Sequence, residues 1–248
     1  MDAIINPQKF DAVLFDMDGV LTATAKVHAA SWKKMFDGFL KKRAAETGEP
    51  FIPFDINTDY KLYVDGKLRD EGVSSFLESR GITLPSGDAG DPPDRDTVIG
   101  LGNRKNKLVN KIIETDGVDI FEGSLALVRL LRRKGIKTAV VSASKNCETV
   151  LKVTGITDLF DAVVDGNIAA RLGLPGKPAP DTFLKAAQML DTEPERAVVV
   201  EDAISGVQAG RAGNFGMVIG VDRHGEPDSL RNNGADIVVD DLDKLLPF

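Results

Sequence analysis

Apolar residues recur along the chain with two different spacings. After residue 117, short runs rich in Val and Ile alternate with stretches whose apolar residues recur every three or four positions. The short runs are typical of strands buried on both faces, and the longer stretches are typical of amphipathic helices. This alternation predicts a parallel sheet covered by helices. The predicted strands are 137–141, 161–164, 197–200, 217–221 and 237–239, and the predicted helices are 125–134, 147–154, 181–190 and 204–212.

The run Asp11–Phe15 resembles these strands in composition, although a long helical region separates it from them. The pattern of apolar residues in that region predicts helices over 25–45, 72–80 and 97–115. Loops are expected at 47–65 and 85–96, and the loop at 85–96 is expected to be exposed. In its first helix, a core face is expected from Trp32, Met35, Phe36, Phe39 and Leu40. We therefore predict an α/β protein. Residues 1–24 and 117–248 form a Rossmann-like parallel sheet core, and residues 25–116 form a helical domain inserted after the first strand.

Composition restricts the partners. The chain has 248 residues, 42% of them hydrophobic and 28% charged, and a net charge of −7. Because basic residues are spread along the chain, neither nucleic acid nor an anionic membrane is expected as a partner. Cys147 is the single cysteine, which excludes an intrachain disulfide and favours a reducing cytoplasm. The first nine residues lack the apolar segment of a secretory signal, and no later stretch is apolar enough to span a bilayer.

Polar side chains follow several of the predicted strands. Asp16 and Asp18 come directly after the first strand, and Gly19 then allows a sharp turn. Ser142 follows the strand at 137–141 and the pair Glu201-Asp202 follows the strand at 197–200, whereas Lys177 lies between two later elements. Ligands of an open parallel sheet bind at the carboxyl ends of its strands, where these groups should meet. Four carboxylates, a hydroxyl and a lysine suit Mg²⁺ and a phosphate group. Taken singly, each has an ordinary structural explanation as a turn, a helix cap or a surface lysine.

Taken together, these residues resemble the motifs of a known superfamily. Asp16-Met17-Asp18-Gly19, Ser142, Lys177-Pro178 and Glu201-Asp202 look like the four motifs of the haloacid dehalogenase superfamily. The helical insertion resembles the cap domain of its members. Segments 24–28, 104–106, 142–146 and 177–181 are similar to the β-phosphoglucomutase-like subfamily.

The resemblance implies a role for each motif. Asp16 would be the nucleophile that forms an aspartyl-phosphate, and Asp18 would be the general acid and base. Mg²⁺ would be held by Asp16, the main-chain carbonyl of Asp18 and Asp202, with Glu201 in support. Substrate or phosphate binding is implied for Ser142, Ala143, Lys145, Asn146, Lys177, Thr24, His28, Arg69 and Lys105, with Arg69 on a second, non-transferring phosphate. On the residues alone, a lone histidine on a helix, such as His28, is more often structural than catalytic, and Lys105 could equally belong to a solvated helix face.

The implied activity is a Mg²⁺-dependent interconversion of β-glucose 1-phosphate and glucose 6-phosphate. The alternative is a phosphatase that uses the same Asp16 but passes the phosphoryl group to water. A non-catalytic binding protein is a third possibility, which the presence of every motif residue disfavours. The chain departs from the subfamily pattern at Ala23, where an acidic residue is common, and in a cap lengthened at 51–61 and 85–96. No partner is needed to complete the site, so a monomer acting on a small sugar phosphate is expected.

Overall fold

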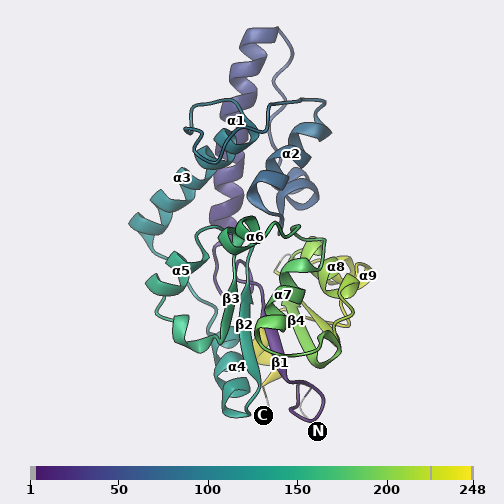
Figure 1. Cartoon of the computed structure of the whole chain (residues 1–248). Coiled ribbons are helices and arrows are strands. Elements are labelled where there is room, and N and C mark those ends of the chain that lie inside the picture. The colour runs from purple at the N-terminus through teal and green to yellow at the C-terminus, as the bar shows by residue number, and fades with distance from the viewer. Residues whose placement is uncertain (1–3, 224, 247–248) are drawn as a thin grey trace. The chain divides into compact units, whose positions relative to one another are not determined.

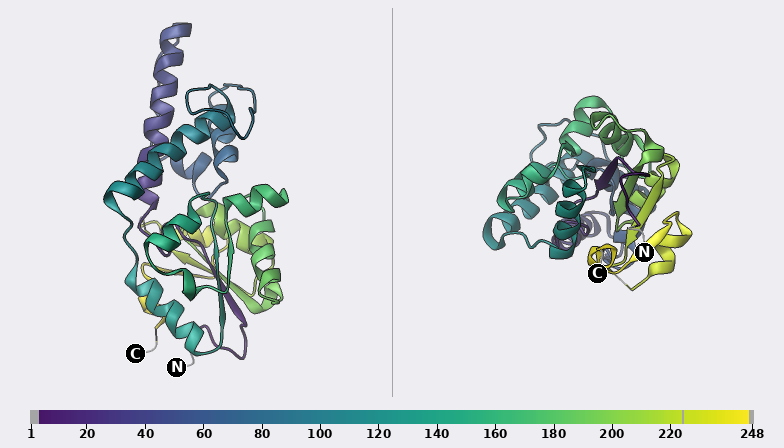
Figure 2. Two further views of the ribbon diagram at one scale, coloured as in Figure 1. Left: turned by 60° about the vertical axis from the view of Figure 1, so that its left-hand side comes forward. Right: turned by 90° about the horizontal axis from the view of Figure 1, so that it is seen from below.

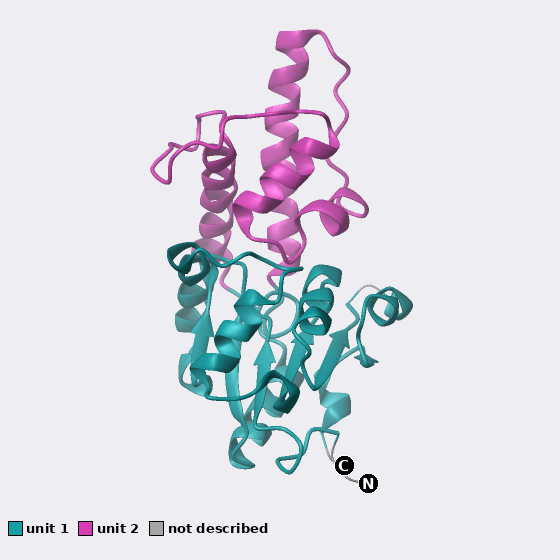
Figure 3. Cartoon of the chain, turned by 45° about the vertical axis from the view of Figure 1, so that its right-hand side comes forward, with its two compact units in different colours: residues 1–23, 118–248 teal, residues 24–117 magenta. Residues whose placement is uncertain are grey.

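The computed structural model describes residues 4–223 and 225–246 (Figure 1). The chain divides into two compact units, coloured separately in Figure 3. The larger unit contains Met1–Ala23 and Val118–Phe248, and the smaller unit contains Thr24–Gly117. Among the described residues, no helix combines the length and the apolar character needed to cross a lipid bilayer.

A six-stranded parallel sheet forms the centre of the larger unit, in the order β3-β2-β1-β4-β5-β6. Every residue of β1 is buried, which explains its uninterrupted apolar sequence. The α/β fold with a parallel sheet, predicted from the sequence, is confirmed. The strands are β1 Ala12–Phe15, β2 Lys137–Val141, β3 Ala162–Val164, β4 Ala197–Glu201, β5 Met217–Val221 and β6 Ile237–Val239.

Helices lie on both faces of this sheet (Figure 2). They are α4 Glu122–Arg133, α5 Cys147–Val153, α6 Gly166–Leu172, α7 Asp181–Met189, α8 Ile204–Ala212 and α9 Pro227–Asn232. On one face, Phe183 of α7 and Val207 of α8 belong to the same buried cluster as Leu14 of β1. The sequence analysis did not predict α6 or α9, which are seven and six residues long.

Three helices and a short π-helical turn make up the smaller unit. They are α1 Ala25–Thr47, the turn Tyr60–Val64, α2 Arg69–Ser79 and α3 Val98–Asp116. The predicted core face of α1 is confirmed, since all five of its expected side chains are buried. The ring of Phe36 lies 4.2 Å from that of Phe76 and 5.2 Å from that of Phe54, measured between centroids. The turn at Tyr60–Val64 falls in a stretch that was expected to be loop.

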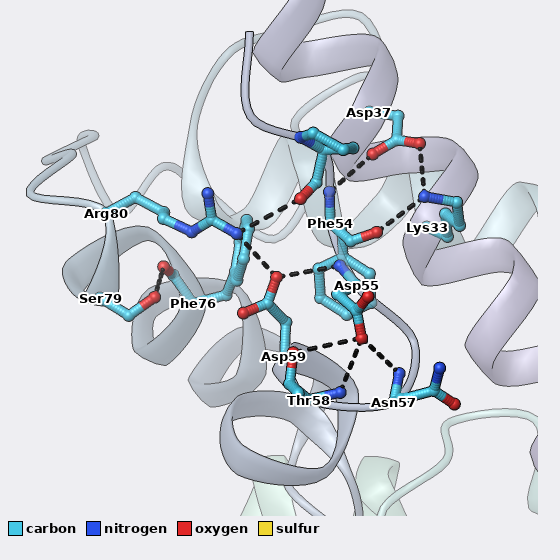
Figure 4. A network of polar contacts seen from close by, with 11 residues as sticks. Lys33, Asp37, Phe54, Asp55, Asn57, Thr58, Asp59, Phe76, Ser79 and Arg80 are labelled. Atoms are coloured by element: carbon cyan, nitrogen blue, oxygen red, sulfur yellow. Dashed lines mark hydrogen bonds and ion pairs between the residues drawn. The ribbon is translucent and has the colours of Figure 1, made fainter.

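The segment before that turn is fixed by polar contacts to two helices (Figure 4). Phe54 is fully buried, and its backbone N–H donates to Asp37 Oδ1 at 2.8 Å. Its carbonyl accepts from Lys33 Nζ at 2.7 Å. Arg80, the residue directly after α2, donates to Asp59 Oδ2 at 2.7 Å. These contacts replace the hydrogen bonds that a strand or helix would have supplied to this stretch.

The loop over 85–96 has no regular structure, as predicted, but it is not uniformly exposed. Asp91 is buried, and its carboxylate accepts from Thr97 Oγ1 at 2.7 Å and from Arg95 Nη1 at 2.6 Å. It also accepts the backbone N–H of Asp88 at 3.2 Å. The expectation of an exposed loop was wrong for Asp91, because these donors stabilise a buried carboxylate.

Candidate active site

Asp16 lies one residue beyond β1, at the carboxyl edge of the sheet. Its N–H donates to the carbonyl of Val200 in β4 at 2.9 Å, so strand pairing continues to this position. Asp16 itself is buried. Gly19 has φ +86°, and a Cβ there would lie 1.8 Å from Asp202 Oδ2. Only glycine therefore fits this position, where the turn after Asp18 passes against the Asp202 carboxylate.

Lys177 is a buried cation between two carboxylates. Its Nζ lies 2.5 Å from Asp16 Oδ1 and 2.6 Å from Glu201 Oε1. It also donates to the carbonyl of Val141 at 3.2 Å. A buried ammonium is stable only when carboxylates and carbonyls surround it, and here they come from the ends of three strands.

The end of β4 supplies two adjacent acids. Glu201 Oε2 accepts the backbone N–H groups of Asp202 and Ala203, each at 3.0 Å. Oxygen atoms of Asp16, Glu201 and Asp202 lie within 4.8 Å of one another, close enough to hold one metal ion. Gly206 in α8 faces Glu201, since a Cβ there would lie 1.8 Å from Glu201 Oε1. Gly206 could not be singled out from the sequence, because its importance depends on this contact rather than on a local pattern.

The end of β2 brings a hydroxyl to the same edge. Ser142 extends β2 by donating its N–H to the carbonyl of Val164 at 3.0 Å. Its Oγ lies 3.4 Å from Asp18 Oδ2 and accepts the N–H of Ser144 at 3.1 Å. The core motif residues Asp16, Asp18, Ser142, Lys177, Glu201 and Asp202 therefore lie together.

The residues after Ser142 form a loop against the start of α6, a helix the sequence did not predict. A Cβ on Gly166 would lie 2.6 Å from the Ala143 carbonyl. The Lys145 carbonyl accepts from Asn167 Nδ2 at 2.9 Å. Asn146 is buried, and its N–H donates to Ser144 Oγ at 3.2 Å. The loop conformation thus depends on α6.

The charges at this edge do not balance. Burial raises the pKa of Asp16 above its ordinary value; Lys177 opposes this change, and the Glu201 and Asp18 carboxylates add to it. Burial alone would lower the pKa of Lys177, but the charges of Asp16 and Glu201 raise it. One ammonium therefore faces an excess of carboxylates, an environment that suits a divalent cation with oxygen ligands.

Cys147 begins α5 close to this edge but has a different character. It is fully buried, and burial raises the pKa of its thiol well above its ordinary value. Nearby carboxylates, Asp18 among them, raise it further. A neutral, buried thiol is a poor nucleophile, which agrees with its interpretation as a helix residue.

Four predicted site residues lie in the smaller unit. Thr24 is buried, and its carbonyl accepts the N–H of His28 in the first turn of α1 at 2.9 Å. Lys105 Nζ lies 2.9 Å from His28 Nδ1 and 4.9 Å from the centroid of the Trp32 ring. Lys105 is only 5% exposed, so it does not belong to a solvated helix face. Arg69 is not part of this pair and contacts Asp70, with its Nε 3.2 Å from Asp70 Oδ1.

The fold and the site together define a class of α/β protein in which the central parallel strand ends in an Asp-x-Asp turn beside a buried lysine and an acidic pair. The model of the haloacid dehalogenase-like hydrolase family matches residues 10–214. The chain belongs to this family, and within it to the β-phosphoglucomutase-like subfamily.

Individual relatives agree with this assignment. The chain is 49% identical over 243 residues to β-phosphoglucomutase of Mycobacterium tuberculosis, a match covering 97% of this chain and 93% of that protein. It is 33% identical to β-phosphoglucomutase of Bacillus subtilis, over 92% of this chain and 88% of that protein. The crystal structure of β-phosphoglucomutase from Clostridium difficile matches with a TM-score of 0.73 and 28% identity, covering 96% of this chain and 93% of that one.

Proposed function

We propose that this protein is a Mg²⁺-dependent phosphotransferase that converts β-glucose 1-phosphate to glucose 6-phosphate through an aspartyl-phosphate on Asp16. The observation that carries the proposal is the placement of Asp16 beside Lys177 and the acidic pair that ends β4. The high identity to proteins named β-phosphoglucomutase supports the choice of substrate.

In the first half of the reaction, an Asp16 oxygen attacks the phosphorus of the donor, and the bond from phosphorus to the departing oxygen breaks. Asp18 donates a proton to that oxygen. In the second half, Asp18 takes the proton from an acceptor hydroxyl, whose oxygen attacks the aspartyl-phosphate and releases Asp16. The protein thus returns to its starting protonation state.

A metal ion fits the excess of buried carboxylates at this edge. Asp16, Asp202 and the main-chain carbonyl of Asp18 would hold Mg²⁺, with Glu201 in support. When bound, the ion supplies positive charge that offsets the charge of the phosphoryl oxygens. Ser142 Oγ and Lys177 Nζ would bind those oxygens, a hydroxyl donor and a point charge respectively. Ala143, Lys145 and Asn146, in the loop after Ser142, would bind the substrate.

The smaller unit is proposed to act as the cap. Thr24, His28 and Lys105 would respond to cap closure and help to place Asp18, and Arg69 would bind the non-transferring phosphate. Closure matters chemically because an aspartyl-phosphate in contact with water hydrolyses, which would turn the transferase into a phosphatase. A monomer acting on a small sugar phosphate is consistent with a core site built from one chain.

A coupled assay tests the proposal. The protein is incubated with β-glucose 1-phosphate, Mg²⁺ and a trace of glucose 1,6-bisphosphate, while glucose 6-phosphate and free phosphate are followed in parallel. We expect glucose 6-phosphate to rise without phosphate, to stop with EDTA and to resume when Mg²⁺ is restored. Asp16→Asn should abolish turnover, whereas the exposed control Asp158→Asn should not change it. Phosphate rising in place of glucose 6-phosphate would contradict the mutase and establish a phosphatase.

A further inference from the structure

Arg223 follows β5 and reaches the turn that carries Asp18. Its Nε donates to the carbonyl of Gly19 at 2.8 Å. Its Nη1 donates to the Asp240 carbonyl at 3.0 Å and lies 3.3 Å from Asp241 Oδ2. The side chain is 16% exposed, and its buried Nη2 has no hydrogen-bond partner among the described residues. This arginine thus keeps a charged, largely buried head group beside a backbone carbonyl.

The guanidinium group also stacks on the ring of Phe121, a residue whose backbone contacts the same turn. Its central carbon lies 3.7 Å from the centroid of the Phe121 ring. The N–H of Phe121 donates to the carbonyl of Leu21 at 2.9 Å, and Ser124 Oγ donates to the carbonyl of Val20 at 2.6 Å. The three consecutive carbonyls of Gly19, Val20 and Leu21 therefore accept hydrogen bonds from groups outside the turn. The planar guanidinium group both stacks and donates, a combination that a lysine ammonium does not reproduce.

The Gly19 contact matters because glycine is the least restrained residue of the turn. Without a Cβ, its flanking peptide groups rotate easily unless both are held. The N–H of Gly19 donates to the Thr22 carbonyl at 2.8 Å, and the Arg223 contact holds the Gly19 carbonyl. The Asp18–Gly19 peptide, which carries this N–H, sets the orientation of Asp18, and the Gly19–Val20 peptide, which carries the carbonyl, is joined to it through Gly19 alone. Arg223 thereby restrains the backbone on which Asp18 depends.

We propose that Arg223 is a positioning residue for Asp18, which it keeps oriented for proton transfer by donating to the Gly19 carbonyl while stacked on the Phe121 ring. The catalytic part of this inference rests on the proposed function. Its structural part, a turn held by Arg223, is independent of the substrate.

The experiment compares Arg223→Met and Arg223→Lys with the matched control Arg211→Met. Arg211 lies in α8 and forms a comparable ion pair, 2.7 Å from Asp236, on the exposed surface of the same unit. Amide hydrogen exchange is measured over residues 17–22 without substrate, and kcat and KM are measured in the coupled assay. The melting temperature of each variant shows whether it is folded. If Arg223→Met is not folded, the proposal is judged on Arg223→Lys.

We expect both Arg223 variants to exchange faster at residues 17–22 than the wild type and to lose kcat by about 10- to 100-fold, the range of one hydrogen bond to a charged group. KM should change by less than about threefold, since Arg223 is not placed on the substrate. Arg211→Met should match the wild type. Unchanged exchange, or a kcat within about twofold of wild type in a folded variant, would overturn the proposal.

The two parts can fail separately. If the wild type turns over neither β-glucose 1-phosphate nor the general ester p-nitrophenyl phosphate, the proposed function fails. Hydrogen exchange then decides the present inference: loosening confined to residues 17–22 supports it, and unchanged protection refutes it.

Discussion

Replacement of Lys177 by methionine tests the electrostatic account of the site most directly. Methionine keeps much of the side-chain volume but removes the ammonium that lies 2.5 Å from Asp16 and 2.6 Å from Glu201. Both carboxylates are buried, so the change leaves two close negative charges without a cation. Breaking a buried ion pair by removing one partner costs about 3–5 kcal/mol of folding free energy. At 2–4 °C per kcal/mol, the melting temperature should fall by roughly 6–20 °C.

The loss of folding free energy in Lys177→Met should depend on pH, and the direction of this dependence follows from the pKa of Asp16. Burial already raises the pKa of Asp16, and removing the opposing charge of Lys177 raises it further. An acid whose folded-state pKa is raised destabilises the fold increasingly as pH rises from about 4, where the unfolded chain ionises, through the folded-state pKa. Lys177→Met should therefore be closer to wild type at about pH 5 than at about pH 8.

The assay is urea denaturation followed by far-UV circular dichroism, in EDTA so that bound metal does not restore the missing charge. Lys185→Met is the matched control, because Lys185 lies on α7, is only partly buried, and has an ammonium whose hydrogen bond to Gln188 Oε1 is exposed to solvent. It should change the free energy of unfolding by no more than about 0.5 kcal/mol. A loss below about 1 kcal/mol for Lys177→Met, or an equal loss at both pH values, would refute the reasoning.

Two further substitutions test packing. Phe54→Ala should destabilise the smaller unit by about 3–5 kcal/mol, because a fully buried ring is lost. The loss is measured by urea denaturation, followed by the fluorescence of Trp32, the single tryptophan. A loss below about 1 kcal/mol would show that Phe54 does not anchor its segment. Gly206→Ala should weaken Mg²⁺ binding and lower kcat, because its Cβ would displace Glu201. The control Gly38→Ala meets no atom within 4 Å and should instead stabilise its helix by about 1 kcal/mol. Unaltered metal binding in Gly206→Ala would refute the role given to that contact.

The larger unit could be predicted from the sequence because its strands have an unambiguous signal. A strand buried on both faces must be apolar throughout, and β1 and β4 are. Parallel strands in a right-handed α/β fold then place the residue after each strand at one edge, which was enough to expect Asp16, Ser142 and the Glu201-Asp202 pair together.

Other features were beyond such reasoning. The burial of Asp91 in a polar loop depends on its contacts with Thr97 and Arg95, and α6, which is seven residues long, was not predicted. Likewise, a polar stretch in α3 gives no sign that Lys105 is buried beside the Trp32 ring. For Lys105 a partner far away in the sequence sets the environment, whereas the local sequence reports only average preferences.

The central position of β1 in the sheet has a consequence for how the chain is made. Ala12 pairs with Lys137 on one side and with Ala197 on the other, so both neighbours of this strand are synthesised long after it. Until they emerge from the ribosome, an apolar strand with two unpaired edges must be kept from associating with other chains. The smaller unit, whose residues are contiguous, has no such delay and is free to fold first. The phosphoryl-transfer site would then be among the last parts of the molecule to assemble, which limits the chance that a half-made chain acts on a phosphate ester.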